Sequence, residues 1–276
     1  MVDLSMVAQA ADAPPELIYM IMDHLHADPR SLAVCSTVCR AWLPPTRYHL
    51  FSTVRISPPT ANGFLELLQS SNITFLPYIR RLEIDQIGYD RTSPSLWMSA
   101  TALMPYLTPL VAVRSLQLRN IYRGQIGEAS HTRVTIFAST LGNIKQLEVQ
   151  KVDFKDSTHL INFLCDFRLL ERLSLEVHLL DNEAPQYSGR RRISSTLRSL
   201  RLVIDAEGPG TDIFRWLSSH NPLPAIRDLE LYSLMILELS AAGHFVRALR
   251  NNLRNLAISL FFYSSSTIPA GESPFP

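Results

Sequence analysis

Few residues of this chain have the types and spacing that catalysis or metal binding requires. Cys35 and Cys39 lie one helical turn apart, but no second pair of Cys or His residues completes a zinc site. His24 and His26 lack a set of Cys or carboxylate partners, and Cys165 lies in an apolar stretch where a thiol is usually part of the core. The sequence contains neither a Gly-rich phosphate loop nor a G-x-S-x-G motif. We therefore predict a non-catalytic protein without metal or cofactor, against the weaker alternative of an α/β enzyme whose site the sequence does not reveal.

Composition and charge indicate a globular protein. Of the 276 residues, 46% are hydrophobic, so the chain can bury a sizeable core. The net charge of +1 favours neither nucleic acid nor a membrane surface as a partner, and we expect neither. Three cysteines, an odd number, fit a reduced intracellular chain, cytoplasmic or nuclear, better than a secreted disulfide scaffold. No stretch approaches the ~20 apolar residues of a membrane span, and residues 1–12 contain acids instead of the basic start of a signal peptide, so we expect a disordered lead there.

Residues 13–56 carry a dense helical pattern of apolar side chains. Pro14 suits a helix start, and Asp28 with Pro29 ends this helix and opens the next. Two apolar rows lie between these points: Leu17, Ile21 and Leu25 form one, and Ile18 and Met22 form the other. A second helical pattern is predicted to end at Pro44 and Pro45 and comprises Leu32, Val34, Val38, Cys39 and Trp42. Because so short a segment cannot bury so many apolar residues alone, it needs the rest of the chain, a second protein, or both.

This pattern resembles an F-box. The residues that carry the resemblance are Pro14, Glu16, Leu17, Ile21, Leu25, Leu32, Val38, Cys39, Arg40 and Trp42. Residues 47–54 (RYHLFSTV) resemble the exit of F-boxes in fungal proteins, whereas Ala13 stands where the family usually has Leu. The resemblance implies a three-helix module that docks on a Skp-type adaptor and so tethers a substrate receptor to a cullin–RING ubiquitin ligase. The adaptor contacts that it implies are Pro14, Leu17, Ile18, Ile21, Leu25, Leu32, Val38 and Trp42.

Beyond residue 56 one phrase, apolar-x-x-Leu-x-apolar, occurs seven times. The copies begin at Ile79, Val113, Ile144, Leu170, Leu197, Ile226 and Leu253, 26 to 34 residues apart. Such regular spacing indicates a repeat architecture, and the alternation at the end of each phrase predicts a half-buried strand whose Leu and final apolar residue face the core. Helical stretches are expected between the strands, at 63–68, 96–107, 135–141, 160–167, 213–218 and 239–249, with a long loop at 181–196.

Strand, crossover helix and parallel strand in repetition resemble a leucine-rich-repeat array, although the Asn that this family usually has after the strand is absent. The resemblance implies a solenoid with parallel strands on the concave face, which captures the substrate, and helices on the convex face. We predict a substrate surface from residues that flank the buried Leu side chains: Arg81, Glu83, Gln117, Glu148, Arg172, Arg201, Asp228 and Glu230. Their mixed charges suit a protein ligand better than a phosphate backbone. The alternatives are a solvated polar face without a ligand and, for the fold, a doubly wound α/β domain.

The second residue of the phrase is basic in six of the seven copies. These residues are Arg80, Arg114, Lys145, Arg198, Arg227 and Arg254, and Glu171 is the exception. If the phase of the phrase holds, they line one rim of the array. They either form a basic edge for an acidic or phosphorylated partner or cover apolar surface with their stems while their charges stay in water.

The sequence thus predicts an α/β chain with a lead at 1–12, an F-box at 13–56, a leucine-rich-repeat-like array at 57–262 and a tail at 263–276. The function implied by the two resemblances is that of a substrate receptor of a Skp–cullin–F-box ubiquitin ligase. Its partners would be a Skp-type adaptor, through it the cullin–RING ligase, and an unidentified protein substrate. The alternative is a repeat scaffold outside any ligase, capped by the helical segment. We expect the apolar end at 253–262 to be covered by the tail or by another chain, unless the sequence is truncated.

Overall fold

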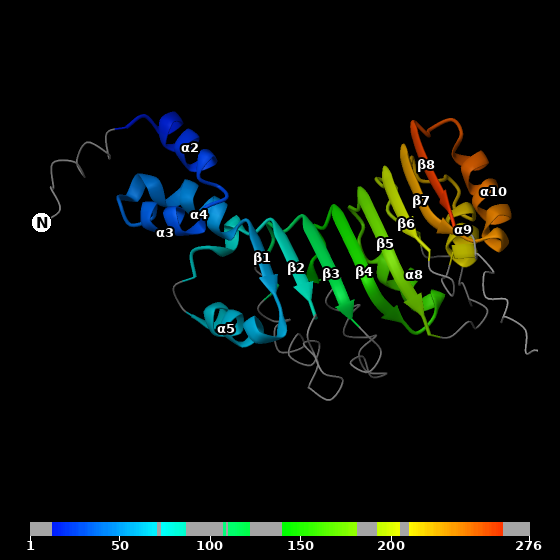
Figure 1. Cartoon of the computed structure of the whole chain (residues 1–276), viewed down its shortest axis with the longest axis horizontal. Coiled ribbons are helices and arrows are strands. Elements are labelled where there is room, and N and C mark those ends of the chain that lie inside the picture. The colour runs from blue at the N-terminus through cyan, green and yellow to red at the C-terminus, as the bar shows by residue number, and fades with distance from the viewer. Residues whose placement is uncertain are drawn as a thin grey trace, which may run out of the picture.

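A computed structural model describes residues 13–70, 73–86, 107–108, 110–121, 140–180, 192–204 and 210–261. The expected lead, tail and loop at 181–191, and most of the helices expected at 96–107 and 135–141, lie outside these ranges. The described residues form a mixed α/β fold around one eight-stranded sheet (Figure 1). Its strands are β1 (Thr53–Ile56), β2 (Arg81–Asp85), β3 (Ser115–Ile121), β4 (Gln146–Phe154), β5 (Arg172–Leu179), β6 (Ser199–Val203), β7 (Asp228–Leu234) and β8 (Asn255–Leu260).

Seven α-helices and three short 3-10 turns accompany the sheet within these ranges. The helices are α2 (Pro15–His24), α3 (Pro29–Cys35), α4 (Leu43–Phe51), α5 (Pro58–Gln69), α8 (Ser157–Cys165), α9 (Gly210–Ser218) and α10 (Leu239–Leu249). The 3-10 turns are η1 (Arg40–Trp42), η2 (Leu76–Tyr78) and η4 (Ile236–Glu238).

All eight strands are parallel, and their order in the sheet is their order in the chain. The repeated phrases align residue for residue: Leu116 pairs with Leu147, Leu147 with Leu173, and Leu173 with Leu200. The central and final apolar residues of the interior copies face the core, and Leu200 and Leu202 are each 1% exposed. The predicted strands and the predicted inward face are therefore confirmed.

β1 is an eighth copy of the phrase, which the sequence reading missed. Residues 51–56 (FSTVRI) place Val54 where the other copies have Leu. Val54 pairs with Leu82 and Ile56 with Ile84, in the register of the later strands. The sheet therefore begins at Thr53 and not at the predicted boundary of residue 57.

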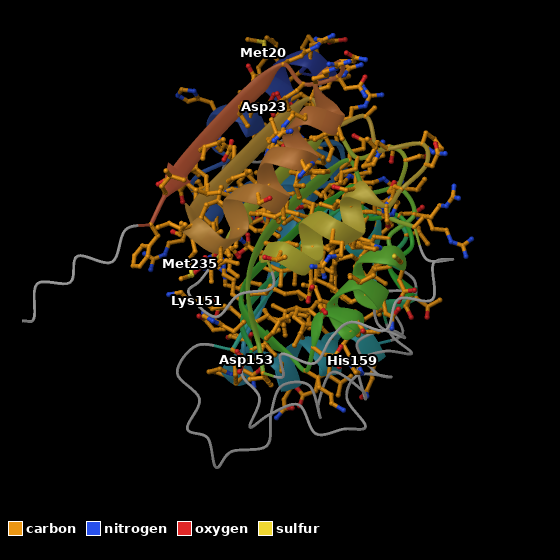
Figure 2. All side chains as sticks on the ribbon, turned by 90° about the vertical axis from the view of Figure 1, so that its right-hand side faces the viewer. Met20, Asp23, Lys151, Asp153, His159 and Met235 are labelled. Carbon is orange, nitrogen blue, oxygen red and sulfur yellow. The ribbon has the colours of Figure 1, made fainter. Side chains whose placement is uncertain are left out.

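Helices follow several of the strands and cover one face of the sheet. α8, α9 and α10 lie along the same face in the view from the β8 end (Figure 2). Together with α5 they correspond to the helices predicted at 160–167, 213–218, 239–249 and 63–68. Asp156 caps α8, because its carboxylate accepts the His159 N–H at 2.9 Å. The core thus lies between the sheet and these helices.

Three strands contain a left-handed residue near their carboxyl ends: Asn120 (φ 56°), Lys151 (φ 53°) and Ser233 (φ 60°). Register shifts accompany the bulges at Lys151 and Ser233. The extra residue returns the next side chain to the core face, so that Ile121 and Leu234 are 0% and 1% exposed. Buried apolar residues therefore follow the left-handed residue in β3 and β7.

The N-terminal helices have a small core of their own. α4 packs against both α2 and α3, and the side chains of Ile18, Met22 and Leu32 are buried between them. His49 Nε2 lies 2.9 Å from Asp23 Oδ1 and joins α4 to α2. The segment is therefore a packed unit and not an extended strap.

The prediction that Pro44 and Pro45 end a helix is wrong. Both lie in the first turn of α4, where the missing N–H groups have no intrahelical partner to lose. The Thr46 hydroxyl donates to the carbonyls of Trp42 (2.8 Å) and Leu43 (3.0 Å) and strengthens the same turn. The helix α4 therefore includes residues 47–51, which the sequence pattern had assigned to the exit of the F-box-like segment.

The helical segment continues directly into the sheet. The rings of Phe51 and Phe75 stack with centroids 4.9 Å apart. The Ser52 carbonyl accepts the N–H groups of Arg80 and Arg81, both at 2.8 Å. These contacts fix α4 at the first edge of the sheet.

Candidate interaction surfaces

The helical segment presents one of its two apolar rows to solvent. Leu17 and Ile21 on α2 are 51% and 43% exposed, and Pro14 at the helix start is also exposed. Ile18 and Met22 in the other row are only 3% and 0% exposed. The row that contains Leu17 and Ile21 is therefore the one available to a partner.

Two predicted adaptor contacts are not at the surface. Ile18 and Leu32 form the core of the segment, where they are 3% and 1% exposed, which corrects their assignment to the docking surface. Leu25, Val38 and Trp42 are half-buried, and Leu25 and Trp42 pack against the same core. The predicted set divides into an exposed part and a structural part because the three helices must first bury residues against one another.

Other exposed apolar residues of this segment were missed as docking candidates. Tyr19 is 51% exposed, and Met20 on α2 and Val34 on α3 are each 66% exposed. In Figure 1, α2 lies at the opposite end of the molecule from α9 and α10. The signal was present in the sequence, because residues 17–22 (LIYMIM) are apolar on every side of a helix and a small segment buries only one side.

The second candidate surface is the face of the sheet opposite the helices. Within the described ranges no helix lies over this face (Figure 2). The side chains of Arg81, Arg201 and Glu230 are 44%, 53% and 45% exposed there. Arg172 is exposed and Asp228 half-buried. These five predicted residues share one face because they occupy alternate positions of aligned strands.

Two predicted substrate residues are enclosed. Glu83 is 7% exposed because Arg55 covers it, with Nε and Nη2 each 2.9 Å from Glu83 Oε2. Arg81 Nε lies 3.9 Å from the other carboxylate oxygen. Gln117 on the neighbouring strand is 3% exposed. Neither Glu83 nor Gln117 is accessible to a ligand in this structure, which corrects the prediction for both.

The remaining acids of this face have nearby polar partners. Glu148 lies 4.0 Å from Arg119 Nη2, and Gln150 Nε2 donates to it at 2.6 Å. Asp228 accepts from Asn255 Nδ2 at 2.6 Å. The open face therefore offers matched pairs of polar groups instead of a field of one sign.

A cluster at β6 and β7 combines charge with an aromatic ring. Arg201 lies over the ring of Tyr232, with its guanidinium carbon 5.0 Å from the ring centroid. Arg201 Nε is 3.7 Å from Glu230, which also accepts from the Tyr232 hydroxyl at 3.3 Å. The sequence reading missed Tyr232, although an aromatic residue on the polar side of a strand was a usable signal.

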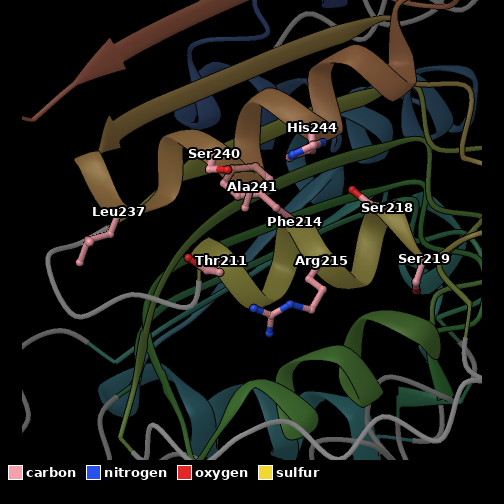
Figure 3. Close-up of a pocket in the computed structure, with 9 residues that line it drawn as sticks. All are labelled: Thr211, Phe214, Arg215, Ser218, Ser219, Leu237, Ser240, Ala241 and His244. Carbon is pink, nitrogen blue, oxygen red and sulfur yellow. The ribbon is translucent and has the colours of Figure 1, made fainter.

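A groove of about 540 Å³ lies between α9 and α10 on the helix-covered side (Figure 3). Its lining consists of Thr211, Phe214, Arg215, Ser218, Ser219, Leu237, Ser240, Ala241 and His244. Ile236 and Leu237 beside it are 73% and 83% exposed. Sequence analysis gave no sign of this groove, because its shape depends on how the two helices pack.

The described residues offer little reactive chemistry. No group of three or more His, Cys, Asp or Glu side chains among them is placed to hold a metal ion. The side chains of Cys35, Cys39 and Cys165 are each half-buried. Burial raises the pKa of the Cys35 thiol, which disfavours its reactive thiolate form. None of the helices in the described ranges has the length and apolar character to cross a bilayer.

Comparisons with known proteins add no family to this description. No protein-family model matches the chain, and no curated protein matches its sequence.

Proposed function

We propose that this protein is the substrate receptor of a Skp–cullin–F-box ubiquitin ligase, built as an F-box followed by a leucine-rich-repeat solenoid. The helices α2 to α4 dock on a Skp-type adaptor and, through it, on the cullin–RING ligase. The open face of the sheet binds a protein substrate. The chain contributes no catalytic group in this role, because ubiquitin transfer belongs to the recruited subunits.

The observation that carries the proposal is the exposed apolar side of α2. Leu17, Met20 and Ile21 are 51%, 66% and 43% exposed, although the segment has already filled its own core with Ile18 and Met22. Neighbouring large apolar side chains left in water are typical of a protein–protein interface. The place of Leu17 and Ile21 in the F-box-like pattern favours the adaptor as the occupant.

The repeated strands support the substrate-binding half of the proposal. Aligned copies of one phrase, in chain order and covered by helices on one face only, are the arrangement expected of a repeat array with an open binding face. The balanced charges of that face suit a protein surface better than a polyanion.

The alternative is a repeat scaffold outside any ligase, with the helical segment as a cap. The continuity of α4 with β1 favours it, because the Phe51–Phe75 stack and the Ser52 carbonyl fix the helices at the first edge of the sheet. The first unit of a repeat array needs such a cover in either case.

Co-purification with a Skp-type adaptor separates the two proposals. We expect the variant Leu17→Ala/Ile21→Ala to lose adaptor binding, because each truncation at an interface centre costs about 2 kcal/mol or more, roughly 30-fold in affinity. Its thermal melt should stay close to that of the wild type, since both side chains are about half exposed.

The matched control is Ile236→Ala/Leu237→Ala, which removes similar side chains that are 73% and 83% exposed at the other end of the chain. This variant should bind the adaptor like the wild type. If Leu17→Ala/Ile21→Ala also binds undiminished, or if the wild type does not bind at all, the helical segment is a cap.

A further inference from the structure

A continuous row of charged residues lies along the edge of the sheet where the strands begin, the upper edge in Figure 1. We call this row the basic ridge; it consists of Arg80, Arg114, Lys145, Glu171, Arg198, Arg227 and Arg254. The backbone N–H of each member from Arg114 onward donates to the carbonyl of the member before it, at 2.7–2.9 Å. The second position of the phrase therefore forms a hydrogen-bonded ladder of its own.

This ladder fixes the spacing of the charges. Neighbouring strands lie about 4.8 Å apart, so successive members of the basic ridge are one strand apart along a line. Equivalent positions of aligned parallel strands point the same way, which places six cations and one anion side by side. A row of this kind cannot be inferred until the phase of every copy is known.

In the first half of the basic ridge the cations already have partners. Arg80 and Arg114 donate through Nη1 to backbone carbonyls of the turn at 111–113, with the shortest distances 3.4 and 2.9 Å. Lys145 Nζ lies 2.7 Å from Glu171 Oε1, and this hydrogen bond lowers the pKa of the Glu171 carboxyl. These side chains stabilise the junctions between successive copies.

In the second half the cations are free. Within the described part of the chain, no hydrogen bond or ion pair engages the guanidinium groups of Arg198, Arg227 and Arg254. Arg198 and Arg254 are exposed and Arg227 is half-buried. Three adjacent strands thus begin with a cation that forms no hydrogen bond or ion pair within the described residues, although the Arg198 charge contributes, after Lys145, to the lowered pKa of Glu171.

The nearest acids along the chain, Glu171 and Asp228, already have hydrogen-bond partners of their own. Glu171 is held by Lys145 at 2.7 Å. Asp228, which follows Arg227, accepts from Asn255 Nδ2 at 2.6 Å. The three guanidinium groups therefore remain open to hydrogen bonds with a ligand in solution, next to the negative charge of Asp228.

We propose that Arg198, Arg227 and Arg254 bind an extended acidic segment of a protein partner. The triplet covers two strand spacings, about 10 Å, which equals the rise of three residues of an extended peptide. A run of four residues rich in Asp or Glu can therefore form charge-assisted hydrogen bonds with all three arginines. The proposal does not depend on adaptor docking.

The width of the basic ridge favours a peptide over the other polyanions. The three arginines form one row of charges. A nucleic-acid backbone or an anionic bilayer presents charges on both sides of such a row. A side chain that only covers apolar surface would not explain why the arginines of one half are held by carbonyls and those of the other half by none.

The test uses the full chain and a fluorescent hexaglutamate peptide, with the matching hexaglutamine peptide as reference, followed by anisotropy at low salt. We expect Arg198→Gln/Arg227→Gln/Arg254→Gln to weaken hexaglutamate binding at least about tenfold. The corresponding triple Arg→Lys variant should keep most of the affinity, since it keeps the charges. Raising the salt should weaken wild-type binding, because these charges are exposed.

The matched control is Arg30→Gln/Arg40→Gln/Arg215→Gln, which removes three exposed cations outside the basic ridge and changes the net charge equally. It should bind the peptide like the wild type. The proposal would be overturned if both triple Arg→Gln variants lost the same amount of hexaglutamate affinity. It would also be overturned if the wild type bound hexaglutamate no more tightly than hexaglutamine. Tighter binding to a single-stranded oligonucleotide or to phosphatidylserine vesicles would overturn it as well. Thermal melts of all variants exclude unfolding as the cause of any loss.

Discussion

The first and last strands of the sheet carry the same apolar pattern in opposite surroundings. In β1, Ile56 is 1% exposed and Val54 is half-buried. In β8, the equivalent Ile258 and Leu256 are 50% and 46% exposed. α5 follows β1 and α4 lies at its edge, whereas in the described part of the chain no element follows Phe261.

This difference shows that the phrase determines to which side of the sheet its apolar side chains point, but not whether those side chains are buried. Both strands turn their apolar residues to the same side of the sheet, because the central and final apolar residues of the phrase pair with their equivalents in β1 and in β8 and the register shifts lie beyond the phrase. Whether those residues are buried depends on the element that covers them, and that element is encoded elsewhere in the chain. Identical positions in an interior and a terminal copy should therefore respond differently to the same substitution.

The largest expected contrast is between Leu200→Asp and Leu256→Asp, which change the same position of the phrase in β6 and β8. Leu200 is 1% exposed, so an unpaired charge there should cost about 4 kcal/mol or more and unfold or aggregate the protein. Leu256 is 46% exposed, so the cost should stay near 1 kcal/mol. Urea or thermal unfolding measures both.

Ser199→Asp is the control for this pair, since Ser199 precedes Leu200 and belongs to the opposite, polar face. Its effect should stay within about 0.5 kcal/mol. Equal losses for Leu200→Asp and Ser199→Asp would mean that inside and outside are assigned wrongly. A severe loss for Leu256→Asp would mean that β8 is covered.

A smaller effect is expected on association at the β8 edge. Residues 255–260 contain no charged side chain, and an edge strand without charges is prone to pair with another chain. We expect wild-type protein to self-associate as its concentration rises, and Ile258→Lys to lower this tendency without a large change in melting temperature. Size-exclusion chromatography with light scattering measures both.

Ile236→Lys is the matched control, because Ile236 is 73% exposed on η4 and not on the edge strand. It should self-associate like the wild type. A wild type that stays monomeric at every concentration would show that the β8 edge is not a contact surface.

The smallest predicted effect is the pH dependence of the unfolding free energy that the buried His220 causes. His220 is buried, with Nδ1 2.8 Å from the Trp216 carbonyl and Nε2 accepting the Ile193 N–H at 3.1 Å. Burial lowers the pKa of His220 below 6.5, and the nearby Arg192 charge adds to this. The folded protein therefore holds the His220 side chain in its neutral form.

The stability linked to His220 is complete above pH 6.5 and is lost as the pH falls towards the lowered pKa of the folded state. The loss reaches at most about 1.4 kcal/mol per pH unit. His220→Gln should flatten this dependence in unfolding experiments between pH 7 and 5. His244→Gln, which changes an exposed histidine on α10, should retain it; equal pH profiles for wild type and His220→Gln would contradict the assignment.

Most of the sheet could be predicted because the alternation within each copy of the phrase shows which of its side chains face the core. The alternation of Leu and a second apolar residue identified β2 to β8. β1 was missed because Val54 replaces Leu and because its residues had been assigned to the helical segment. α4 was missed because Pro44 and Pro45 were taken as a stop when they stand in a first turn.

The surfaces were less predictable, because exposure depends on contacts between elements. The sequence placed Leu17 and Ile18 side by side but could not say which of them α4 would cover. It placed Glu83 and Gln117 on the open face but could not foresee that Arg55 would enclose Glu83. A one-dimensional pattern gives the side of an element and not the neighbours that reach it.

The order of the strands also governs how a chain of this kind can change in length. Each strand pairs only with the copies before and after it, so no strand is closed by a distant part of the sequence. Arg172 and Ser199 occupy the same position in adjacent copies, so deleting residues 172–198 would join equivalent points of two units. Duplication of such a segment would likewise insert a strand between compatible neighbours. Gene duplication can therefore widen or narrow the open face by one strand, and with it the number of side chains that a partner meets, while the remaining junctions stay as they are.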